Sequence, residues 1–569
     1  MARTISIGKQ GFEDLRAKGY FYVDKTSFVS DWWREGDDVT LVCRPRRFGK
    51  TLNLDTVRCF LSTEYAGRGE ELFGGLRVWD DPSMRALQGT VPVIFVSFAR
   101  VKQSSFEDML KRINTILTNA VREHGYLRGW EGLTEVDRAR LNAVDDTMDA
   151  VTCADVPNLL CDLLRRYWGI KPVVLLDEYD APMQQAWTHG FWGEATDFMR
   201  DLMNSTFKTN ESLGRGLITG VTRVSRESIF SDLNNLTVVT TSVPLYQTAF
   251  GFTQSEVDDV LVEFGREDMR QRVCDWYDGF VFDGVSSIYN PWSITHFLRY
   301  GVFDAYWANT SSNSLVSSVV RRGGRVLKRD FEELMRGGRI SKIIDEQVVF
   351  SELDGRPDAV WALLLAAGYL RAPGPVPEDV VHTPRPLELT NREVQATFDR
   401  MVEGWFQDAS DDYDDLCTAI LAGDAETATD CLAEVVYACA SSFDVAGRPS
   451  RRNAPERFYH GLVLGLLAKL RGRYSVESNR ESGYGRYDVA LVPTDGATGT
   501  DSAAVIEFKV FDPRHEETLE DTCVRALAQI ESKHYVAGLV ERGIARERIH
   551  VYGMGFRGKE CLVELEPAQ

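Results

Sequence analysis

The chain of 569 residues is 44% hydrophobic and 26% charged, a composition that excludes general disorder and is typical of folded globular proteins. At roughly 150 residues per domain, this length predicts about three to four domains. Asp and Glu number 85 against 65 Lys and Arg, which gives a formal charge of −20. That charge excludes a protein that coats nucleic acid through bulk positive charge, so any nucleic-acid contact must be local.

The sequence gives no sign of membrane association. Its longest apolar runs, such as Ala359–Leu370 and Gly461–Ala468, fall short of the roughly 18 to 20 residues that a membrane-spanning helix needs. The start MARTISIGKQ lacks the apolar core of a signal peptide. We therefore expect a cytoplasmic protein with no membrane contact.

Three segments with different patterns follow one another: 1–250, 251–455 and 456–569. In the first, short β-branched runs alternate with helical stretches, which predicts an α/β domain with a parallel sheet. Its five expected strands are Val39–Cys43, Val93–Phe98, Val173–Asp177, Gly216–Val221 and Thr237–Thr241. The second segment is predicted to be mostly helical, with helices at Ala359–Leu370 and Val394–Phe406.

The third segment, 456–569, predicts a separate α/β unit with the order αβββαβ. We expect helices at Glu456–Leu470 and Thr518–Gly538, and strands at Ser475–Asn479, Arg486–Pro493, Ala503–Val510 and Arg548–Phe556.

A candidate phosphate-binding loop follows the first strand. VTLVC runs into RPRRFGKT and then into the apolar-periodic TLNLDTVRCFL, which is the strand, loop and helix context that such a loop requires. Backbone N–H groups around Gly49 would hold the phosphates of ATP, Lys50 would reach the β and γ phosphates, and the Thr51 hydroxyl would hold Mg²⁺. Arg44 stands where the general motif GxxxxGK[ST] has its first glycine. On this motif alone, a basic surface turn is an equal alternative.

A second element of an ATP site lies in VVLLDEYD. Asp177 and Glu178 end a strongly apolar strand, where P-loop ATPases place a magnesium-binding carboxylate and a water-activating carboxylate. An ordinary strand ending in acids is the alternative, but the combination with GKT favours the ATP site. After the strand GLITGV, Thr222 and Arg223 are candidates to sense the γ-phosphate, or a capping threonine and a surface arginine.

Four stretches resemble one known family: GYFYVDKT (19–26), RPRRFGKTLNL (44–54), LLDEYDAPM (175–183) and TGVTRVSRESIFSDLNNL (219–236). They look like the AAA-ATPase-like family of bacterial proteins, whose members typically carry a C-terminal PD-(D/E)XK nuclease-like domain. The arginine in RPRRFGKT is itself a mark of that family, so the departure at Arg44 leaves nucleotide binding expected. The resemblance implies an ATPase module fused to a nuclease fold and does not imply a pathway.

The last segment carries a metal-site pattern of its own. In AAVIEFKVF, Glu507 and Lys509 are two residues apart on a strand and therefore share one face. Asp488 begins the apolar part of the preceding strand, RYDVALVP, and the turn-rich PTDGATGTDS permits a hairpin that sets Asp488 beside Glu507. The two carboxylates would bind Mg²⁺ or Mn²⁺, and Lys509 would stabilise the attacking hydroxide.

This is the Asp, then Glu-x-Lys arrangement of PD-(D/E)XK nucleases. A solvated strand face with alternating charges is the alternative, which the αβββαβ order disfavours. Three further residues are candidates near the metal, each with an ordinary surface role as the alternative: Glu456, Glu481 and Gln529.

A basic run covers residues 321–342, where eight Lys and Arg stand against three Asp and Glu. Such a run suits a phosphate backbone, and the helix AVWALLLAAGYL with its PRPLELT turn would fit a winged-helix-like module. A solvated helix face or an internal acidic partner is an equal alternative.

Together these patterns predict an ATP-binding and ATP-hydrolysing protein coupled to a metal-dependent nuclease that acts on nucleic-acid phosphodiesters. DNA is favoured over RNA, and genome defence or DNA processing would be fitting roles. The alternative is a nucleotide-dependent switch whose nuclease fold binds nucleic acid without cleaving it. The sequence assigns neither an oligomeric state nor a pathway.

Overall fold

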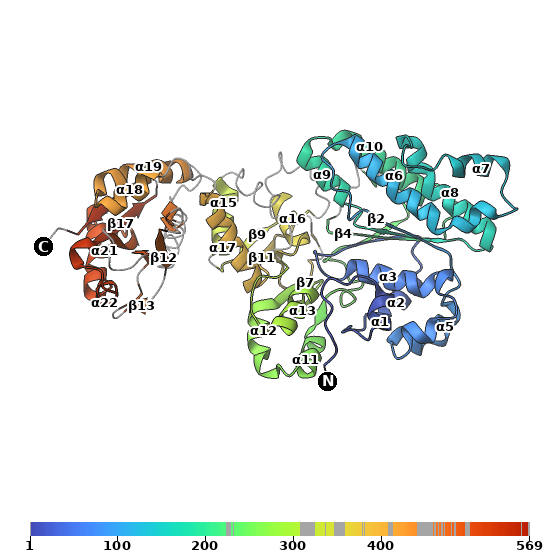
Figure 1. Ribbon diagram of the computed structural model, residues 1–569, viewed down its shortest axis with the longest axis horizontal. Helices are drawn as coiled ribbons and strands as arrows, with labels where there is room; N and C mark the ends of the chain where they lie inside the picture. The colour runs from blue at the N-terminus through green and yellow to red at the C-terminus, as the bar shows by residue number, and fades with distance from the viewer. Residues whose placement is uncertain are drawn as a thin grey trace. The chain divides into compact units, whose positions relative to one another are not determined.

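The structure is a computed structural model in which the chain forms two compact units, Met1–Val319 with Gly337–Gln395, and Val320–Arg336 with Ala396–Gln569 (Figure 1). The residues that the structure describes are 2–222, 229–230, 233–307, 325–335, 337–345, 359–377, 379–380, 382–407, 414–440, 459, 463–464, 466–467, 470, 473–478, 481–482, 485–486, 488–494, 501–558 and 560–566. Within them, no helix has both the length and the apolarity needed to cross a membrane.

A five-stranded parallel sheet lies at the centre of the first unit. Its strands follow the order β2-β3-β4-β1-β5. They are β1 (Val39–Cys43), β2 (Val93–Ser97), β3 (Val173–Asp177), β4 (Arg215–Gly220) and β5 (Leu236–Val239). Runs of aliphatic residues form these strands because helices cover both faces, so both sets of side chains are buried. All five predicted strands are confirmed.

Helices pack on the two faces of this sheet. In Figure 1, α6, α8 and α10 lie on one side and α1, α2, α3 and α5 on the other. The helices of this part are α1 (Phe12–Ala17), α2 (Ser27–Glu35), α3 (Lys50–Leu61), α4 (Gly69–Phe73), α5 (Pro82–Leu87), α6 (Phe106–Glu123), α7 (Glu135–Asn142), α8 (Ala150–Trp168), α9 (Ala181–His189) and α10 (Trp192–Met203).

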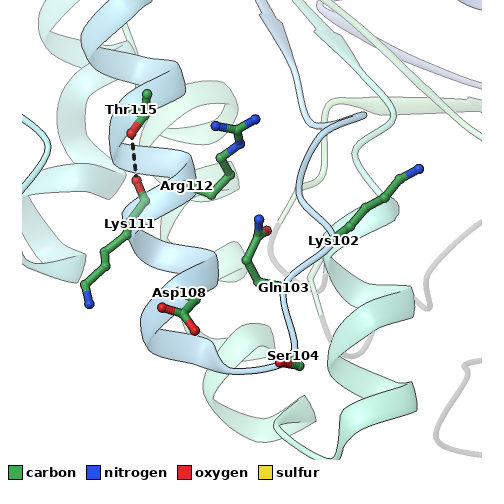
Figure 2. Close-up of a pocket in the computed structure, with 7 residues that line it drawn as sticks. All are labelled: Lys102, Gln103, Ser104, Asp108, Lys111, Arg112 and Thr115. Carbon is green, nitrogen blue, oxygen red and sulfur yellow. Dashed lines mark hydrogen bonds between the residues drawn. The ribbon is translucent and has the colours of Figure 1, made fainter.

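Helix α6 shows why these segments are helical. Met109, Ile113 and Leu117 recur every four residues and are buried against the rest of the unit. The exposed part of the helix carries polar side chains such as Asp108 and Lys111 (Figure 2).

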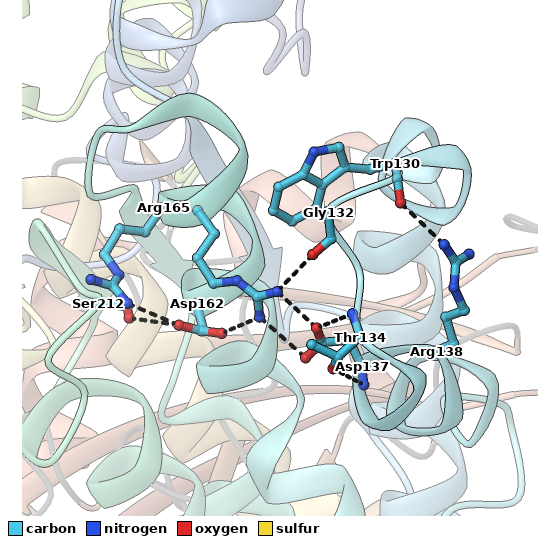
Figure 3. Close-up of polar contacts among 9 residues, drawn as sticks. Trp130, Gly132, Thr134, Asp137, Arg138, Asp162, Arg165 and Ser212 are labelled. Atoms are coloured by element: carbon cyan, nitrogen blue, oxygen red, sulfur yellow. Dashed lines mark hydrogen bonds and ion pairs between the residues drawn. The ribbon is translucent and has the colours of Figure 1, made fainter.

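The helix pair α7 and α8 is joined by a buried carboxylate. Asp137 accepts a hydrogen bond from Nη2 of Arg166 at 2.8 Å and one from the backbone N–H of Thr134 at 2.8 Å (Figure 3). Arg166 also donates to Asp162 at 3.1 Å. The hydrogen bond from Arg166 holds the pKa of Asp137 well below its usual range, while burial opposes the shift. Asp137 is therefore ionised in the folded protein and contributes to its stability.

We expect Asp137→Asn to lower the free energy of unfolding by about 1–2 kcal/mol at neutral pH, because Arg166 loses a charged partner on a partly exposed surface. A lowered folded-state pKa stabilises the protein above the unfolded pKa of about 4, and this stabilisation is lost as the pH falls towards the folded value. Thermal unfolding of both proteins between pH 7 and pH 3 measures the effect. The difference should shrink on acidification, and a difference that is constant or absent would contradict this assignment.

The rest of the first unit contains two small sheets and further helices. The sheets have the orders β6-β8-β7 and β10-β11-β9. Their strands are β6 (Phe252–Thr253), β7 (Asp278–Phe282), β8 (Val285–Tyr289), β9 (Ile340–Lys342), β10 (Leu370–Arg371) and β11 (Arg385–Leu389). The helices are α11 (Gln254–Glu263), α12 (Arg270–Tyr277), α13 (Pro291–Tyr300) and α16 (Ala359–Ala366).

The helical middle of the chain is confirmed, but the predicted PRPLELT turn is wrong. Its residues form β11, which pairs with β9 and β10 on its two sides. Arg385 and Leu387 are buried at the alternating spacing of a strand. The two prolines in this stretch are typical of a turn. The strands that pair with it, β9 and β10, come from other parts of the chain and cannot be read from the stretch itself. The winged-helix-like module stays a prediction.

The second unit contains a mixed five-stranded sheet in the order β12-β15-β16-β17-β18. Its strands are β12 (Tyr474–Ser478), β15 (Val489–Pro493), β16 (Ala503–Val510), β17 (Ile549–Arg557) and β18 (Glu560–Leu565). Strand β15 pairs antiparallel with both β12 and β16, and β16 runs parallel to β17 after the crossover helix α21 (Leu519–Lys533). A two-stranded ribbon of β13 (Glu481–Ser482) and β14 (Gly485–Arg486) and the helix α22 (Ala537–Glu541) complete this part. The edge strand β18 is an addition to the predicted order.

Helices from before residue 455 contribute to the core beneath this sheet. These are α18 (Asp414–Ala422) and α19 (Ala425–Ala440), preceded in the chain by α15 (Arg325–Met335) and α17 (Arg392–Gln407). Leu416 and Leu432 pack in one core with Ile506 and Phe508 of β16. The predicted boundaries at residues 250 and 455 stay predictions, since this core crosses the second of them.

Candidate nucleotide and nuclease sites

The loop between β1 and α3, residues 44–51, is called the phosphate loop below. Gly49 caps α3 with φ +82°, a left-handed conformation that favours glycine. A Cβ built on Gly49 would have no heavy atom within 4 Å, so the space beside the helix N-terminus is open to a phosphate group. The Lys50 side chain is buried, and its Nζ donates to the carbonyl oxygens of Arg44 and Pro45 at 2.9 Å each.

Asp177, at the carboxyl end of β3, is contacted by hydroxyl groups from α3, β2 and β4. It is fully buried, and its Oδ2 accepts hydrogen bonds from Thr51 Oγ1 at 2.9 Å and Ser97 Oγ at 3.3 Å. Its Oδ1 accepts one from Thr219 Oγ1 at 2.7 Å. The structure therefore brings together the hydroxyl and the carboxylate that the sequence assigns to Mg²⁺, and these oxygen donors fit that ion.

Glu178 lies next to this carboxylate. Burial raises the pKa of its carboxyl group, and the neighbouring Asp177 raises it further, whereas Lys50 opposes the shift. Burial lowers the pKa of Lys50, and the carboxylates of Glu178, Asp180 and Asp177 oppose that change. A carboxylate with a raised pKa is suited to accept a proton from water near neutral pH.

The backbone of Glu178 is left-handed, with φ +50°. For a residue with a side chain this conformation costs on the order of 1 kcal/mol, and such strain clusters at functional sites. The backbone conformation agrees with a role for Glu178 in chemistry.

The residues after β4 are held by Asp180. Its Oδ2 accepts hydrogen bonds from the backbone N–H groups of Val221 and Thr222 at 2.9 and 3.1 Å, and from Thr222 Oγ1 at 3.2 Å. The Thr222 hydroxyl is thus engaged with Asp180, and both roles considered for Thr222 stay predictions. Arg223 lies outside the described residues.

Arg44 has a role that the sequence did not predict. Its side chain is fully buried, and its guanidinium donates to the carbonyl oxygens of Thr240 at 2.8 Å and Leu245 at 3.0 Å. It also lies 5.0 Å from the ring centroid of Phe282. Where other phosphate loops have glycine, this chain has an arginine whose hydrogen bonds connect the loop to the segment after β5.

We expect Arg44→Gly, which restores the general motif, to destabilise the protein by about 3 kcal/mol or more. The buried carbonyl oxygens that Arg44 serves would lose charged hydrogen bonds, and a cavity would remain. Thermal unfolding measures the loss, with Arg46→Gly as the control, because the Arg46 guanidinium donates to the side chain of Gln184. Equal melting temperatures of Arg44→Gly and the wild type would contradict the stabilising role that we assign to the Arg44 hydrogen bonds.

The phosphate loop is also braced by the small sheet β6-β8-β7 and by α13. The ring of Phe48 packs edge-to-face on Phe280 at 4.7 Å. Asn290 Nδ2 donates to the carbonyl oxygen of Arg46 at 3.1 Å, and the guanidinium of Arg47 lies over Trp292 at 4.1 Å. A segment more than 230 residues further along the chain thus fixes the shape of the loop.

In the second unit, the sheet register brings Asp488 opposite Glu507. Strands β15 and β16 pair antiparallel with Val489 opposite Ile506, and the next pair in this register is Asp488 and Glu507. Two residues on, Ala490 and Val505 pack in one core with α21. Because side chains alternate along a strand, Asp488 and Glu507 lie on that same face of the sheet.

Polar contacts connect the predicted nuclease residues. Glu507 is 1% exposed, and its Oε1 accepts a hydrogen bond from Lys509 Nζ at 2.9 Å. Gln529 of α21 also donates to Oε1 of Glu507. The Oδ2 of Asp488 accepts the backbone N–H of Phe508 at 2.9 Å. The structure therefore gathers Asp488, Glu507, Lys509 and Gln529 at one place.

Tyr535 is a further member of this site. Gln529 Nε2 donates to its hydroxyl at 3.4 Å. Burial is the largest cause that raises the pKa of Tyr535, and the carboxylates of Glu507 and Asp488 raise it further. No sequence pattern pointed to this residue, since an aromatic residue after a helix is ordinarily a core residue.

The two carboxylates fit a magnesium ion, which is commonly held by one or two carboxylates together with water and substrate phosphates. No group of three or more His, Cys, Asp or Glu with metal-site geometry occurs in the described part of the chain. Glu456 and the side chain of Glu481 lie outside the described residues. Lys509 is positioned by its contact with Glu507, as a cation beside the expected metal should be.

Only part of the basic run 321–342 belongs to the described residues. There, Arg339 pairs with Glu388 at 2.5 Å, and the Lys342 ammonium lies over the ring of Trp361 at 5.6 Å. Arg339 thus has an internal acidic partner, as one of the alternatives expects, whereas Lys342 contacts an aromatic ring. The remaining described part forms α15, with Phe331 and Leu334 buried.

Comparison with known proteins finds a match for a segment near each end of the chain. Residues 6–230 match the family described as a predicted AAA-ATPase, and residues 454–566 match the PD-(D/E)XK nuclease superfamily. A protein of Azotobacter chroococcum mcd 1, described as an uncharacterized protein in the vnfD 5′ region, is 29% identical over 373 residues. That match spans 65% of this chain and 64% of the relative. Residues 6–230 are thus similar to AAA-ATPase-like domains, and residues 454–566 are similar to domains of the PD-(D/E)XK nuclease superfamily.

Proposed function

We propose that this protein hydrolyses ATP in its first unit and cleaves nucleic-acid phosphodiesters in its second, in a metal-dependent reaction that the nucleotide state controls. Such an activity would serve genome defence or DNA processing, and DNA is the substrate that we favour. The observation that carries the proposal is the joint presence of two complete polar sites, around Asp177 and around Glu507.

In the first unit, the phosphate loop would hold ATP with magnesium. The ion would supply positive charge that stabilises the phosphate groups. Lys50 would exchange its two loop carbonyl oxygens for phosphate oxygens, since its Nζ already lies across the loop. Thr51 and Asp177 would hold the ion, and Glu178 would orient a water molecule and take its proton.

In the second unit, Asp488 and Glu507 would hold a magnesium or manganese ion, which would lower the pKa of a bound water molecule. Lys509 would stabilise the charge that develops on the scissile phosphate. Gln529, which donates to Glu507, would keep that carboxylate oriented. These roles require the four side chains at one place, as the sheet register and α21 arrange them.

A cleavage assay with the full chain tests the proposal. Labelled single-stranded and double-stranded DNA and RNA are incubated with Mg²⁺ or Mn²⁺, with and without ATP, and with EDTA as the control. We expect cleavage of at least one substrate that EDTA abolishes. If the protein binds nucleic acid yet cleaves none of the panel under any nucleotide condition, the binding-switch alternative replaces this proposal.

A further inference from the structure

A pocket of about 460 Å³ lies beside the loop that follows β2 and the first turns of α6 (Figure 2). It is open and mostly polar. Its lining residues are Lys102, Gln103, Ser104, Asp108, Lys111, Arg112 and Thr115. None of these residues takes part in the nucleotide site described above.

The pocket is locally positive in a chain whose formal charge is −20. Lys111 is paired with the exposed Glu107 at 2.7 Å, and Asp108 accepts a hydrogen bond from Ser105 Oγ at 2.9 Å. Lys102 and Arg112 form no ion pair with any described residue. Two cations on the pocket wall are therefore available to an anionic ligand.

The wall also contains polar atoms with unused hydrogen-bonding capacity. In the described part of the chain, neither Gln103 Oε1 nor Arg112 Nε has a hydrogen-bond partner, although both atoms are shielded from solvent. A shielded polar atom without a hydrogen bond is unfavourable, because it has lost its contacts with water. In Figure 2 the Gln103 amide lies between the side chains of Lys102 and Arg112. A ligand that draws the Gln103 and Arg112 side chains into the pocket would donate a hydrogen bond to Gln103 Oε1 and accept one from Arg112 Nε.

The pocket lies at the functional edge of the parallel sheet. Its loop leaves the carboxyl end of β2, where the Ser97 hydroxyl and the Phe98 backbone N–H donate to Asp177, at 3.3 Å to Oδ2 and 2.9 Å to the carbonyl oxygen. In open α/β sheets, ligands bind outside the carboxyl ends of the strands. The loop is thus anchored on the carboxylate that we assign to magnesium.

We propose that this pocket, which we call the α6 pocket, binds the phosphodiester backbone of a nucleic-acid strand. The inference rests on the proposed nuclease function and gives the ATPase unit its own contact with the substrate. Phosphate oxygens would accept hydrogen bonds from Lys102 and Arg112, and amino or hydroxyl groups of the strand would donate to Gln103. This is the local positive contact that an acidic chain needs in order to hold nucleic acid.

The test compares two charge-matched double variants of the full chain. Lys102→Ala with Arg112→Ala removes the free cations of the α6 pocket. Arg122→Ala with Arg138→Ala removes two exposed cations elsewhere in the same unit, one of them on the same helix. Binding of a fluorescent single-stranded DNA is followed by anisotropy at several salt concentrations without divalent metal, and thermal unfolding checks that both variants are folded.

We expect the pocket variant to bind DNA about tenfold or more weakly at low salt, and the slope of log affinity against log salt to fall by about 1.4, because two fewer phosphates are neutralised. The control variant should match the wild type in both respects.

If the pocket variant binds DNA with wild-type affinity and slope while the wild type cleaves DNA, the α6 pocket is not the contact and the nuclease proposal stands. If the wild type binds no nucleic acid, both proposals are overturned. A pocket variant that loses affinity for a labelled poly-glutamate peptide, but not for DNA, would make this a protein-binding site and refute the inference.

Discussion

Lys50→Ala should abolish ATP binding, and Glu178→Gln should preserve binding while stopping hydrolysis. The buried Lys50 ammonium lies across the phosphate loop, and its removal leaves the β and γ phosphates without their charged hydrogen bonds, a loss of about 3 kcal/mol or more than 100-fold in affinity. Glutamine keeps the shape of Glu178 but cannot accept a proton, so turnover should fall by about 10²–10⁴-fold. Equilibrium binding of labelled ATP and release of phosphate measure the two effects.

The control for this pair is Lys171→Ala, which removes an exposed lysine just before β3, at the opposite edge of the sheet. It should bind and hydrolyse ATP like the wild type. Unchanged ATP affinity in Lys50→Ala would refute the assignment of the phosphate loop. Normal turnover in Glu178→Gln would show that another group activates the water.

In the second unit, Asp488→Ala, Glu507→Ala and Lys509→Ala should each reduce phosphodiester cleavage by at least about 10²–10³-fold in Mg²⁺ or Mn²⁺. The first two remove a carboxylate that would hold the ion, and the third removes the cation that contacts Glu507 at 2.9 Å. ATP binding should persist in all three, because the two sites belong to different compact units. Cleavage rates, ATP affinity and thermal unfolding are measured on the same preparations.

Exposed residues of α21 supply the matched controls for the nuclease site. Glu531→Ala removes an acid and Lys533→Ala removes a base, both from the solvent side of the helix that carries Gln529. Both variants should cleave normally. Full activity in any one of the three site variants would remove that residue from the proposed mechanism.

Local patterns were enough to predict the parallel sheet and to select residues that lie close together in the structure, around Asp177 and around Glu507. A buried strand such as VVLLD can be predicted because its four aliphatic residues are adjacent in the sequence. The same holds for GKT before a helix, and for Glu507 and Lys509 at the alternating spacing of a strand. Thr51 and Asp177 meet in the structure because the carboxyl ends of parallel strands lie at one edge of the sheet.

Features that depend on distant segments were missed or misread. Arg44, which departs from the phosphate-loop motif, donates hydrogen bonds to the carbonyl oxygens of Thr240 and Leu245, about 200 residues later in the chain. The strand β11 was predicted as a turn because its pairing with β9 and β10 cannot be read from PRPLELT. Tyr535 joins the nuclease site only because α21 places Gln529 between its hydroxyl and Glu507.

The most direct test of the central claim, that nucleotide controls the nuclease, is the cleavage rate of labelled nucleic acid in Mg²⁺ with and without ATP, for the wild type and Lys50→Ala. The account predicts that ATP changes the wild-type rate severalfold and leaves the Lys50→Ala rate unchanged, while both proteins require the metal. Equal rates with and without ATP in a wild-type preparation that hydrolyses ATP would contradict it.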